Sequence, residues 1–339
     1  MFNKFFINKS NLIENINNIK AQKPNVKICA MVKANAYGVG AKEVVEILND
    51  YVDFFGVVNS TEAENIKNLT NKKILITGGL DTSHINSRFS YTCNSLEDVM
   101  MLKELDKMLN IHIKINTGMN RYGISKINEF ITCLNELKNS KLTLEGVYTH
   151  FATTDSFVEH QLLKFNQFIS VLKQKGLSAI VHADNSHVFD TRHHNFDMAR
   201  IGFNLYNNTT NGYKPVVTIK TTITQVNKVK SGDVVGYDRR FVANRLMKIA
   251  ILPIGYADGF DLDYIGLKLN IAGTKCSVLN VCMDCFMLDI TDTKLKKGDT
   301  VYILNNVNPL SLYAKYATTS EYLIMCRFGA IRADKEIVL

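Results

Sequence analysis

Short apolar runs alternate with amphipathic segments over the first two thirds of the chain, and this rhythm restricts the fold more than any other feature. In residues 158–175, Val158, Leu162, Phe165 and Ile169 recur at spacings of four and three, which predicts one buried helix face. The other expected helices span 11–20, 41–51, 62–69, 96–109 and 127–137. The expected strands span 28–32, 54–58, 74–77, 89–92, 111–115, 144–149, 180–183 and 198–205.

Eight strands that alternate with helices over about 200 residues predict a (β/α)8 barrel of the TIM type. An open doubly wound sheet is the alternative, but its glycine-rich first turn is absent, because Gly38-Val39-Gly40 lacks the third glycine. Ser95 is expected to cap the helix at 96–109, with Asp98 at the position that completes a capping box.

After residue 212 the helical pattern nearly disappears and strand-like runs follow one another. They span 216–228, 247–254, 267–271, 276–290 and 300–304, with short helices expected at 310–316 and 320–325. We therefore expect two domains: a barrel over residues 1–212 and a C-terminal β-rich domain over residues 213–339.

Composition excludes several classes of protein. With 46% hydrophobic and 21% charged residues, the chain can bury a large core and is not expected to be disordered. Its longest apolar stretches, such as 249–254, are much too short to span a bilayer. Lys4 and Lys9 interrupt the N-terminal apolar stretch, and no cleavage site follows it, so a soluble, cytoplasmic protein is expected.

The charged and sulfur-containing residues do not form a recognisable binding motif. The net charge of +8 comes from lysines that are scattered rather than clustered, so nucleic-acid binding is not expected. Seven cysteines without a secretory context indicate free thiols. Cys282 and Cys285 have CxxC spacing, but they lack a second ligand pair and lie in an alternating apolar run. We expect them to be buried, with no metal site.

Polar side chains gather where the predicted barrel strands end. Lys33 follows a buried strand, and loss of solvation would lower its pKa and make its amine nucleophilic, as a Schiff base with a carbonyl cofactor requires. Arg121, His150, Ser186 and Arg200 each lie at or near the end of another predicted strand. Taken singly, each could be a surface or core residue. Together they predict a site at the C-terminal end of the barrel.

Eight ordered motifs then identify a family. AMVKANAYGVGA, INTGMNRYG, YTHFAT, HADNS, ARIGFNLY, VVGYDRRF, PIGYADGF and VCMD occur in this order between about residues 5 and 335. The chain resembles the alanine racemases, which are fold-type III pyridoxal 5′-phosphate enzymes with a barrel and a β-domain. The resemblance implies a homodimer that interconverts L- and D-alanine, a small-molecule substrate, and a role in supplying D-alanine for peptidoglycan.

The resemblance also implies a role for each motif residue. Lys33 is similar to the lysine that forms the Schiff base and then acts on the D-face of the α-carbon. Tyr237 is similar to the tyrosine that acts on the L-face from the partner subunit. Arg200 would contact the pyridine nitrogen of the cofactor, and His150 would pack on its ring. The phosphate cradle would consist of Tyr37, Ser186, Gly202 and Phe203.

Further residues match substrate positions, and several depart from the family pattern. Arg121 would bind the substrate carboxylate, and Met283 and Tyr256 would line the pocket from the partner. Lys114 matches a lysine that is carbamylated in some members. Asn116 replaces a common aspartate, Val39 a histidine and Ala330 a tyrosine, while Leu262 and Asn280 stand where entry-corridor arginines that partner Asp155 are common.

These departures leave the two proposed bases intact but affect access and substrate size. The alternatives are therefore a racemase of broader or different specificity, for example for serine, a non-catalytic carrier of pyridoxal phosphate, or a decarboxylase of the same fold type. Arg200 argues against the decarboxylase, because those enzymes generally carry a glutamate at the pyridine nitrogen. The β-domain that bears Tyr237 and Met283 argues against the carrier protein.

Overall fold

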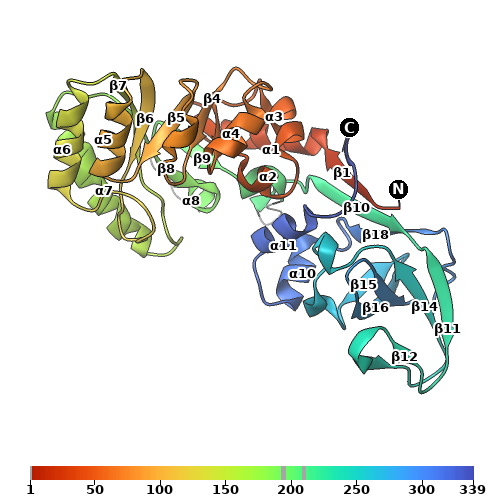
Figure 1. Cartoon of the computed structure of the whole chain (residues 1–339). Helices are drawn as coiled ribbons and strands as arrows, with labels where there is room; N and C mark the ends of the chain where they lie inside the picture. Colours follow the sequence, from red (N-terminus) through yellow and green to blue (C-terminus); the bar gives the residue numbers. More distant parts are fainter. Residues whose placement is uncertain (1, 192–195, 208–210) are drawn as a thin grey trace. The chain divides into compact units, whose positions relative to one another are not determined.

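The computed structural model describes residues 2–191, 196–207 and 211–339, which form two compact units (Figure 1). The barrel unit contains Asn15–Ala36 and Ala41–Leu205, and the sheet unit contains Met1–Glu14, Tyr37–Gly40 and Tyr206–Leu339. Among the described residues, no helix is long and apolar enough to cross a membrane. The single domain boundary expected between residues 212 and 213 stays a prediction.

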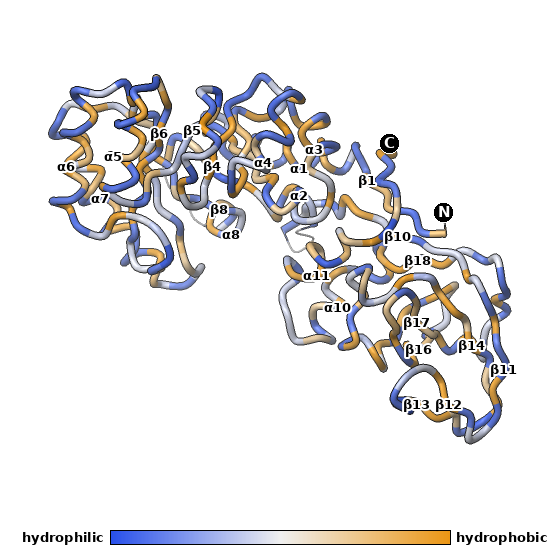
Figure 2. The backbone as a smooth tube through the Cα atoms, viewed as in Figure 1, coloured by the Kyte–Doolittle hydropathy of each residue, from blue (hydrophilic) through white to orange (hydrophobic). Residues whose placement is uncertain are grey.

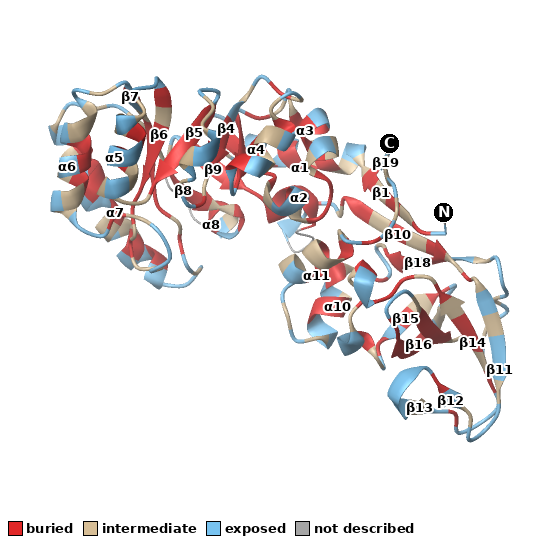
Figure 3. Ribbon diagram, viewed as in Figure 1, coloured by how far each residue is buried: buried red, intermediate tan, exposed pale blue. Residues whose placement is uncertain are grey.

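In the described part of the chain, eight parallel strands close into a barrel, as the sequence predicted. They are β2 (Lys27–Met31), β3 (Phe54–Val57), β4 (Lys73–Ile76), β5 (Phe89–Cys93), β6 (Leu109–Lys114), β7 (Leu142–Tyr148), β8 (Ile180–Asn185) and β9 (Met198–Ile201). Pairing of β2 with β9 closes the cylinder. Every residue of β3, β5 and β9 is buried, because a barrel strand is covered on both faces (Figure 3).

Helices precede, connect and follow these strands. They are α1 (Lys9–Gln22), α3 (Ala41–Leu48), α4 (Ser60–Ile66), α5 (Leu96–Glu104), α6 (Ile127–Leu137), α7 (Phe157–Gln174), α8 (Ser186–Thr191) and α9 (Phe203–Tyr206). Several of them, such as α3, α6 and α7, are amphipathic. In Figure 2, α5, α6 and α7 mix hydrophobic with hydrophilic residues along their length. Val158, Phe165 and Ile169 are buried as predicted for α7, whereas Leu162 is half-buried at the edge of this face.

The start of α5 follows the predicted capping only in part. The Ser95 hydroxyl accepts a hydrogen bond from the Asp98 amide at 3.1 Å, as expected. The Asp98 carboxylate accepts from the amide of Asn94 at 2.6 Å, one residue earlier than the capping box predicted.

The sheet unit is built from two antiparallel-rich sheets and a hairpin. Among the described residues, one sheet has the order β11 (Gln225–Val229), β14 (Met247–Leu252), β17 (Phe286–Asp289), β16 (Thr274–Val281) and β15 (Lys268–Ile271). The other has the order β18 (Thr300–Leu304), β10 (Val217–Thr222), β1 (Lys4–Asn8) and β19 (Lys335–Val338). The hairpin consists of β12 (Val234–Val235) and β13 (Phe241–Val242), and the helices are α10 (Leu310–Tyr316) and α11 (Glu321–Phe328).

The structure corrects three of the expected strands. The run at 198–205 is a strand only over β9 and continues as helix α9. Two other runs are each divided in two. The run at 216–228 changes partner between β10 and β11, where the amide of Ile223 donates to Asp299 and that of Thr224 to Ile251. The run at 276–290 turns back on itself, because the Cys282 amide donates to the Cys285 carbonyl at 2.7 Å. The CxxC spacing therefore belongs to a tight turn between β16 and β17.

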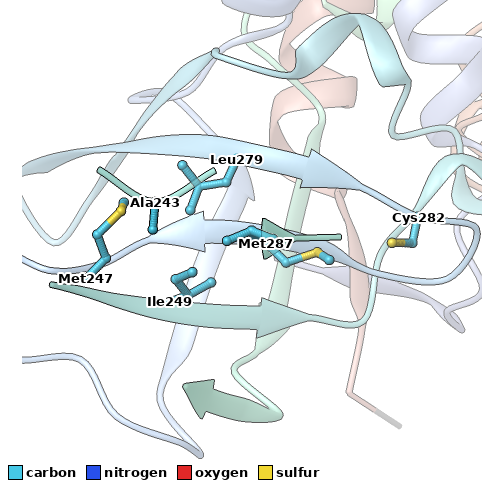
Figure 4. Packing of buried hydrophobic residues seen from close by; sticks show 7 residues of the cluster. Ala243, Met247, Ile249, Leu279, Cys282 and Met287 are labelled. Carbon is cyan, nitrogen blue, oxygen red and sulfur yellow. The ribbon is translucent and has the colours of Figure 1, made fainter. Parts of the chain in front are cut away.

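A hydrophobic cluster fills the inner face of the larger sheet, and Figure 4 shows how its side chains converge. Its buried members are Val235, Ala243, Met247, Ile249, Leu279, Cys282 and Met287. Cys282 is thus a core residue, as predicted, whereas Cys285 is half-buried at the edge of the cluster. Both thiols are free.

Candidate active site

The C-terminal ends of the barrel strands place several of the predicted site residues in one unit. Lys33 follows β2, Arg121 lies in the loop after β6, and His150 follows β7. Ser186 follows β8, and Gly202 and Phe203 follow β9. The carboxyl ends of parallel barrel strands meet at the same face, so these residues share one end of the barrel.

Lys33 opens a turn, α2 (Lys33–Tyr37), whose backbone is left-handed. Ala34, Asn35 and Ala36 have φ angles of 52°, 54° and 53°, each of which costs a residue with a Cβ atom about 1–2 kcal/mol. Specific acceptors offset this strain. The Glu62 carboxylate accepts from the Ala34 amide at 2.7 Å and from the Val58 amide at 2.8 Å.

Tyr37 ends this turn and belongs to the sheet unit. Its ring centroid lies 5.6 Å from that of Tyr206 and 5.9 Å from that of Tyr322. The turn is also anchored on its other side, where the Asn35 side chain accepts from the Ala41 amide at 2.8 Å. The role of Tyr37 in a phosphate cradle stays a prediction.

Arg200 is buried inside the barrel among neutral acceptors. Its guanidinium donates to His182 Nδ1 at 2.7 Å and to the Thr149 carbonyl at 2.8 Å, and it lies 3.3 Å from His150 Nδ1. Its Cζ atom lies 4.8 Å from the ring centroid of Tyr148. Arginine carries only donors, so the facing histidine nitrogens must be unprotonated. The structure thus brings Arg200 and His150 together, while their roles at a cofactor stay predictions.

Basic side chains accumulate beside Arg200. Lys114 is only 5% exposed, and burial, together with the charges of Arg200, Arg121 and Lys33, lowers its pKa to about 7. Burial and the same cations hold the pKa of His150 well below its ordinary value. Lys114, Arg121 and His150 line one small cavity. This end of the barrel is therefore suited to an anionic ligand.

The lowered pKa of Lys114 also bears on its chemistry. With a pKa of about 7, a substantial fraction of its amine is neutral at pH 7. A neutral amine is the form that reacts with carbon dioxide, so carbamylation of Lys114 remains a prediction. Asn116 lies close by and uses its carbonyl oxygen to accept from the amides of Gly118 and Asn120, which fixes the loop before Arg121.

Ser186 and the segment after β9 form a compact donor group. The Ser186 hydroxyl oxygen accepts from the amides of Gly202 at 3.0 Å and Asn204 at 3.4 Å. The Asn204 side chain donates back to the Ser186 carbonyl at 3.0 Å and to Asp190 at 2.7 Å. A hydroxyl that accepts two amides still has its own proton to donate. These contacts bring Ser186, Gly202 and Phe203 together, as the cradle requires.

In the sheet unit, Tyr237 stands on an exposed 3-10 turn. Its residue is 71% exposed, and the turn, η3 (Tyr237–Arg239), follows Gly236 at φ 72°. The Asn280 amide donates to the carbonyls of Val235 at 2.9 Å and Tyr237 at 3.0 Å, and so it holds this turn. Asn280, which the sequence marked only as a departure, is therefore a support for Tyr237.

Tyr237 and Tyr256 line a common cavity of about 380 Å³ together with Leu262 and Asn280. Met283 does not line this cavity. Its side chain is exposed, and it lies three residues after Asn280 in the sequence. The Tyr256 amide donates to the Cys282 carbonyl and the Ala257 amide to the Met283 carbonyl, each at 3.0 Å. The loops that carry Tyr256 and Met283 are thus tied together.

Asp155 forms a local turn just before α7. Its carboxylate accepts from the Thr153 hydroxyl at 2.6 Å and the Phe157 amide at 2.8 Å. The carboxylate thus has local partners in the same loop.

Sequence reasoning missed the polar residues inside the barrel. His112 and Glu145 are buried within β6 and β7, and the available signal was a histidine or a glutamate that interrupts an otherwise apolar strand. The structure shows that both are hydrogen-bonded to one another and, through His182, to Arg200.

Two family models match the chain along most of its length. The model of the alanine racemase N-terminal domain matches residues 7–209, and that of the C-terminal domain matches residues 216–336. An alanine racemase of Francisella philomiragia is 31% identical over an alignment of length 351. The alignment covers 94% of this chain and 95% of the relative.

Solved structures agree with the family models. An alanine racemase from Clostridium difficile is 28% identical with a TM-score of 0.92, and the match covers 100% of this chain and 96% of that one. An alanine racemase from Bartonella henselae with covalently bound pyridoxal phosphate shares the fold at 23% identity, with a TM-score of 0.90 and full coverage of both chains. The chain therefore belongs to the alanine racemase family, whose members are isomerases.

Proposed function

We propose that the chain is a pyridoxal-phosphate-dependent racemase that interconverts L- and D-alanine. The observation that carries the proposal is the buried Arg200, which two uncharged imidazoles face at the barrel end where Lys33 stands. Family membership supplies the reaction class. The remaining steps concern the residues that would bind the cofactor and move the proton.

The donor set fits the cofactor. Ser186 retains a hydroxyl proton for a phosphate oxygen, and the Gly202–Phe203 backbone lies beside it. Arg121 and Lys114 add positive charge beside Arg200, where the phenolate and the substrate carboxylate would lie. Lys33 would hold the cofactor covalently through its amine. When bound, pyridoxal 5′-phosphate withdraws electrons from the α-carbon of an amino acid and so acidifies its hydrogen.

Arg200 has a particular effect at a pyridine nitrogen. A guanidinium can donate a hydrogen bond but does not readily give up a proton, so it would leave that nitrogen unprotonated. Electron withdrawal would then be weaker, which disfavours transamination and favours simple proton exchange. The same reasoning argues against decarboxylation.

Racemisation requires two bases on opposite sides of one carbon, one protonated and the other not. We assign the D-face to Lys33 and the L-face to Tyr237 of the partner subunit in a homodimer. The exposure of Tyr237, Tyr256 and Met283 supports this assignment, because a residue that completes another subunit's site must be accessible on its own. Arg121 would hold the substrate carboxylate.

The cavity beside Tyr237 keeps a second candidate specificity open. Leu262 and Asn280 line it at positions where the family commonly has arginines, although Asp238 and Arg240 also line it. An amino acid other than alanine, such as serine, is therefore the alternative substrate. We also place the reaction in the cytoplasm, where D-alanine would serve peptidoglycan synthesis. Growth of a strain that requires D-alanine, with and without this chain, tests the cellular role.

A racemisation assay over a panel of L- and D-amino acids, with the cofactor added, tests the function directly. We expect L- and D-alanine each to approach an equal mixture faster than any other pair. Preference for serine would support the alternative specificity. Cofactor binding without racemisation would support the carrier protein. Borohydride reduction and peptide mapping should place the cofactor on Lys33.

A further inference from the structure

A continuous chain of hydrogen bonds crosses the inside of the barrel. Arg200 donates to His182 Nδ1 at 2.7 Å, His182 Nε2 lies 2.8 Å from His112 Nδ1, and His112 Nε2 lies 3.1 Å from a Glu145 oxygen. We call these four residues the relay. They come from β9, β8, β6 and β7, so the relay connects four neighbouring strands inside the barrel.

The two ends of the relay determine where every proton lies. Arg200 can only donate, so His182 Nδ1 carries a lone pair, and the proton of that neutral ring is on Nε2. This proton is donated to His112 Nδ1, and the proton of His112 is therefore also on Nε2. It is donated to Glu145, which as a carboxylate can only accept. Any other tautomer would place two N–H groups, or two lone pairs, against each other.

Burial supports the same protonation states. Both imidazole rings are completely buried, and burial lowers the pKa of His112 and holds that of His182 well below its ordinary value. Burial acts to raise the pKa of Glu145, but hydrogen bonds from His112, Lys73 and Ser90 outweigh it and lower that pKa to about 2. At neutral pH the relay is thus a carboxylate, two neutral rings and a guanidinium.

The local backbone is shaped to build the relay. The register between β6 and β7 shifts so that Ile111 pairs with Leu144 and His112 pairs with Gly146. Glu145 is therefore the additional residue of a β-bulge, a feature that redirects side chains. Gly146 has a separate reason to be glycine, because a Cβ atom there would collide with the His112 ring.

The aromatic packing holds the rings in place. The ring of Tyr148 stacks on His182 with centroids 4.6 Å apart and an interplanar angle of 13°, and the same ring lies against the Arg200 guanidinium. The Tyr148 hydroxyl lies 2.9 Å from Thr92 Oγ1. At the far end, Lys73 and Ser90 each bond the Glu145 carboxylate.

We propose that Glu145 is a positioning residue for Arg200: it anchors the His112–His182 pair in one tautomer, so that His182 offers Arg200 only a lone pair. The carboxylate also places a negative charge at the end of a polarised chain that begins at a buried cation. Arg200 is thereby held in one orientation and directed toward the face where Lys33 stands. The benefit of this Glu145 positioning to catalysis rests on the proposed function, whereas the proton arrangement in the relay does not.

Nitrogen-15 NMR of the cofactor-free protein with labelled histidines tests the proton arrangement without an activity assay. At pH 7 we expect His112 and His182 both to be neutral with the proton on Nε2. The signals that disappear in the His112→Asn protein belong to His112, which distinguishes the signals of this ring from those of His182. A proton on Nδ1 of either ring, or two protons on either ring, would overturn the relay, whether or not the chain racemises alanine.

Two substitutions of Glu145 test its effect on Arg200. Glu145→Gln keeps an acceptor oxygen and should preserve the tautomers and the His182 Nδ1 signal. Glu145→Leu removes the acceptor, and it should shift that signal toward the value of a nitrogen without a hydrogen bond. Glu136→Leu removes a carboxylate that pairs with Lys103 on the outside of the barrel unit, and it should change neither ring.

If the proposed function is correct, Glu145→Leu should lower kcat about 10- to 100-fold, with little change in KM. This range is typical for residues that orient the side chains in direct contact with a bound group. Glu145→Gln should retain most of kcat. A folded Glu145→Leu protein with an unchanged His182 signal contradicts the proposal. If Glu145→Leu does not fold, the wild-type tautomers and the Glu145→Gln signal still decide it.

Discussion

Acidification from pH 7.5 to pH 5.5 should destabilise the barrel unit, because His112 and His182 are neutral when folded and bind a proton when unfolded. The folded-state pKa values of both rings lie below the ordinary value, and burial is the main cause. The unfolded state therefore binds more protons at low pH. This contribution to stability is fully present above pH 6.5 and is lost as the pH falls below it.

The size of the effect follows from the linkage between pKa and stability. A ring with an unfolded-state pKa of about 6.5 that stays neutral in the folded protein lowers the free energy of unfolding by about 1.4 kcal/mol between pH 7.5 and 5.5. The two rings together therefore set an upper limit of about 2.7 kcal/mol. His150 acts in the same direction. Asp98 and Glu321, whose pKa values are raised by burial, oppose the trend at lower pH, so the series should stop at pH 5.5.

Urea unfolding of the cofactor-free protein at pH 7.5, 6.5 and 5.5 measures this effect. Far-UV circular dichroism is the suitable probe, since the chain has no tryptophan. The matched control is His84→Asn, an exposed histidine outside the relay, which should leave the pH dependence unchanged. A free energy of unfolding that is constant from pH 7.5 to 5.5, or that rises on acidification, would refute the reasoning.

Three substitutions test other parts of the account. Lys33→Ala should abolish both racemisation and borohydride-stable cofactor attachment while leaving the circular dichroism spectrum intact; residual attachment would move the cofactor to another lysine. Glu62→Ala removes the acceptor of the Ala34 amide and should lower the free energy of unfolding by about 1–2 kcal/mol, measured in urea, whereas no change would show that the left-handed turn needs no such support. Asn280→Ala frees the carbonyl of Tyr237 and should lower kcat without weakening cofactor binding; a loss of cofactor affinity would argue against a role confined to Tyr237.

The barrel strands could be predicted because their signal is local. Buried parallel strands are short apolar runs that polar turns and amphipathic helices separate. Each of the eight runs contains a strand, although the last run ends as helix α9. The site residues at their ends could be located for the same reason. Their individual roles came from the family motifs rather than from any local pattern.

The features that were missed depend on distant partners. β1 is a five-residue strand that pairs with β19, and the two strands lie near opposite ends of the sequence. The sequence around each strand therefore shows no hairpin signal. The break between β10 and β11 arises where the chain changes its sheet partner. The left-handed turn after Lys33 contains alanine and asparagine rather than glycine, and its support comes from Glu62 on another helix.

The relay was missed for a similar reason. His112 and Glu145 lie on neighbouring strands, but a β-bulge, which no sequence pattern marked, brings Glu145 toward the ring. Each residue alone looks like an isolated polar side chain in an apolar strand. Only the assembled barrel shows that both are hydrogen-bonded.

Exchange of the α-hydrogen in deuterated water tests the central claim most directly, because it follows each face of the substrate separately. With the cofactor added, the wild-type protein should incorporate deuterium from L-alanine and from D-alanine and convert each into the other. Tyr237→Phe should still bind the cofactor and exchange D-alanine through Lys33, but it should lose exchange from L-alanine. Exchange of L-alanine at the wild-type rate in Tyr237→Phe would contradict the two-base account.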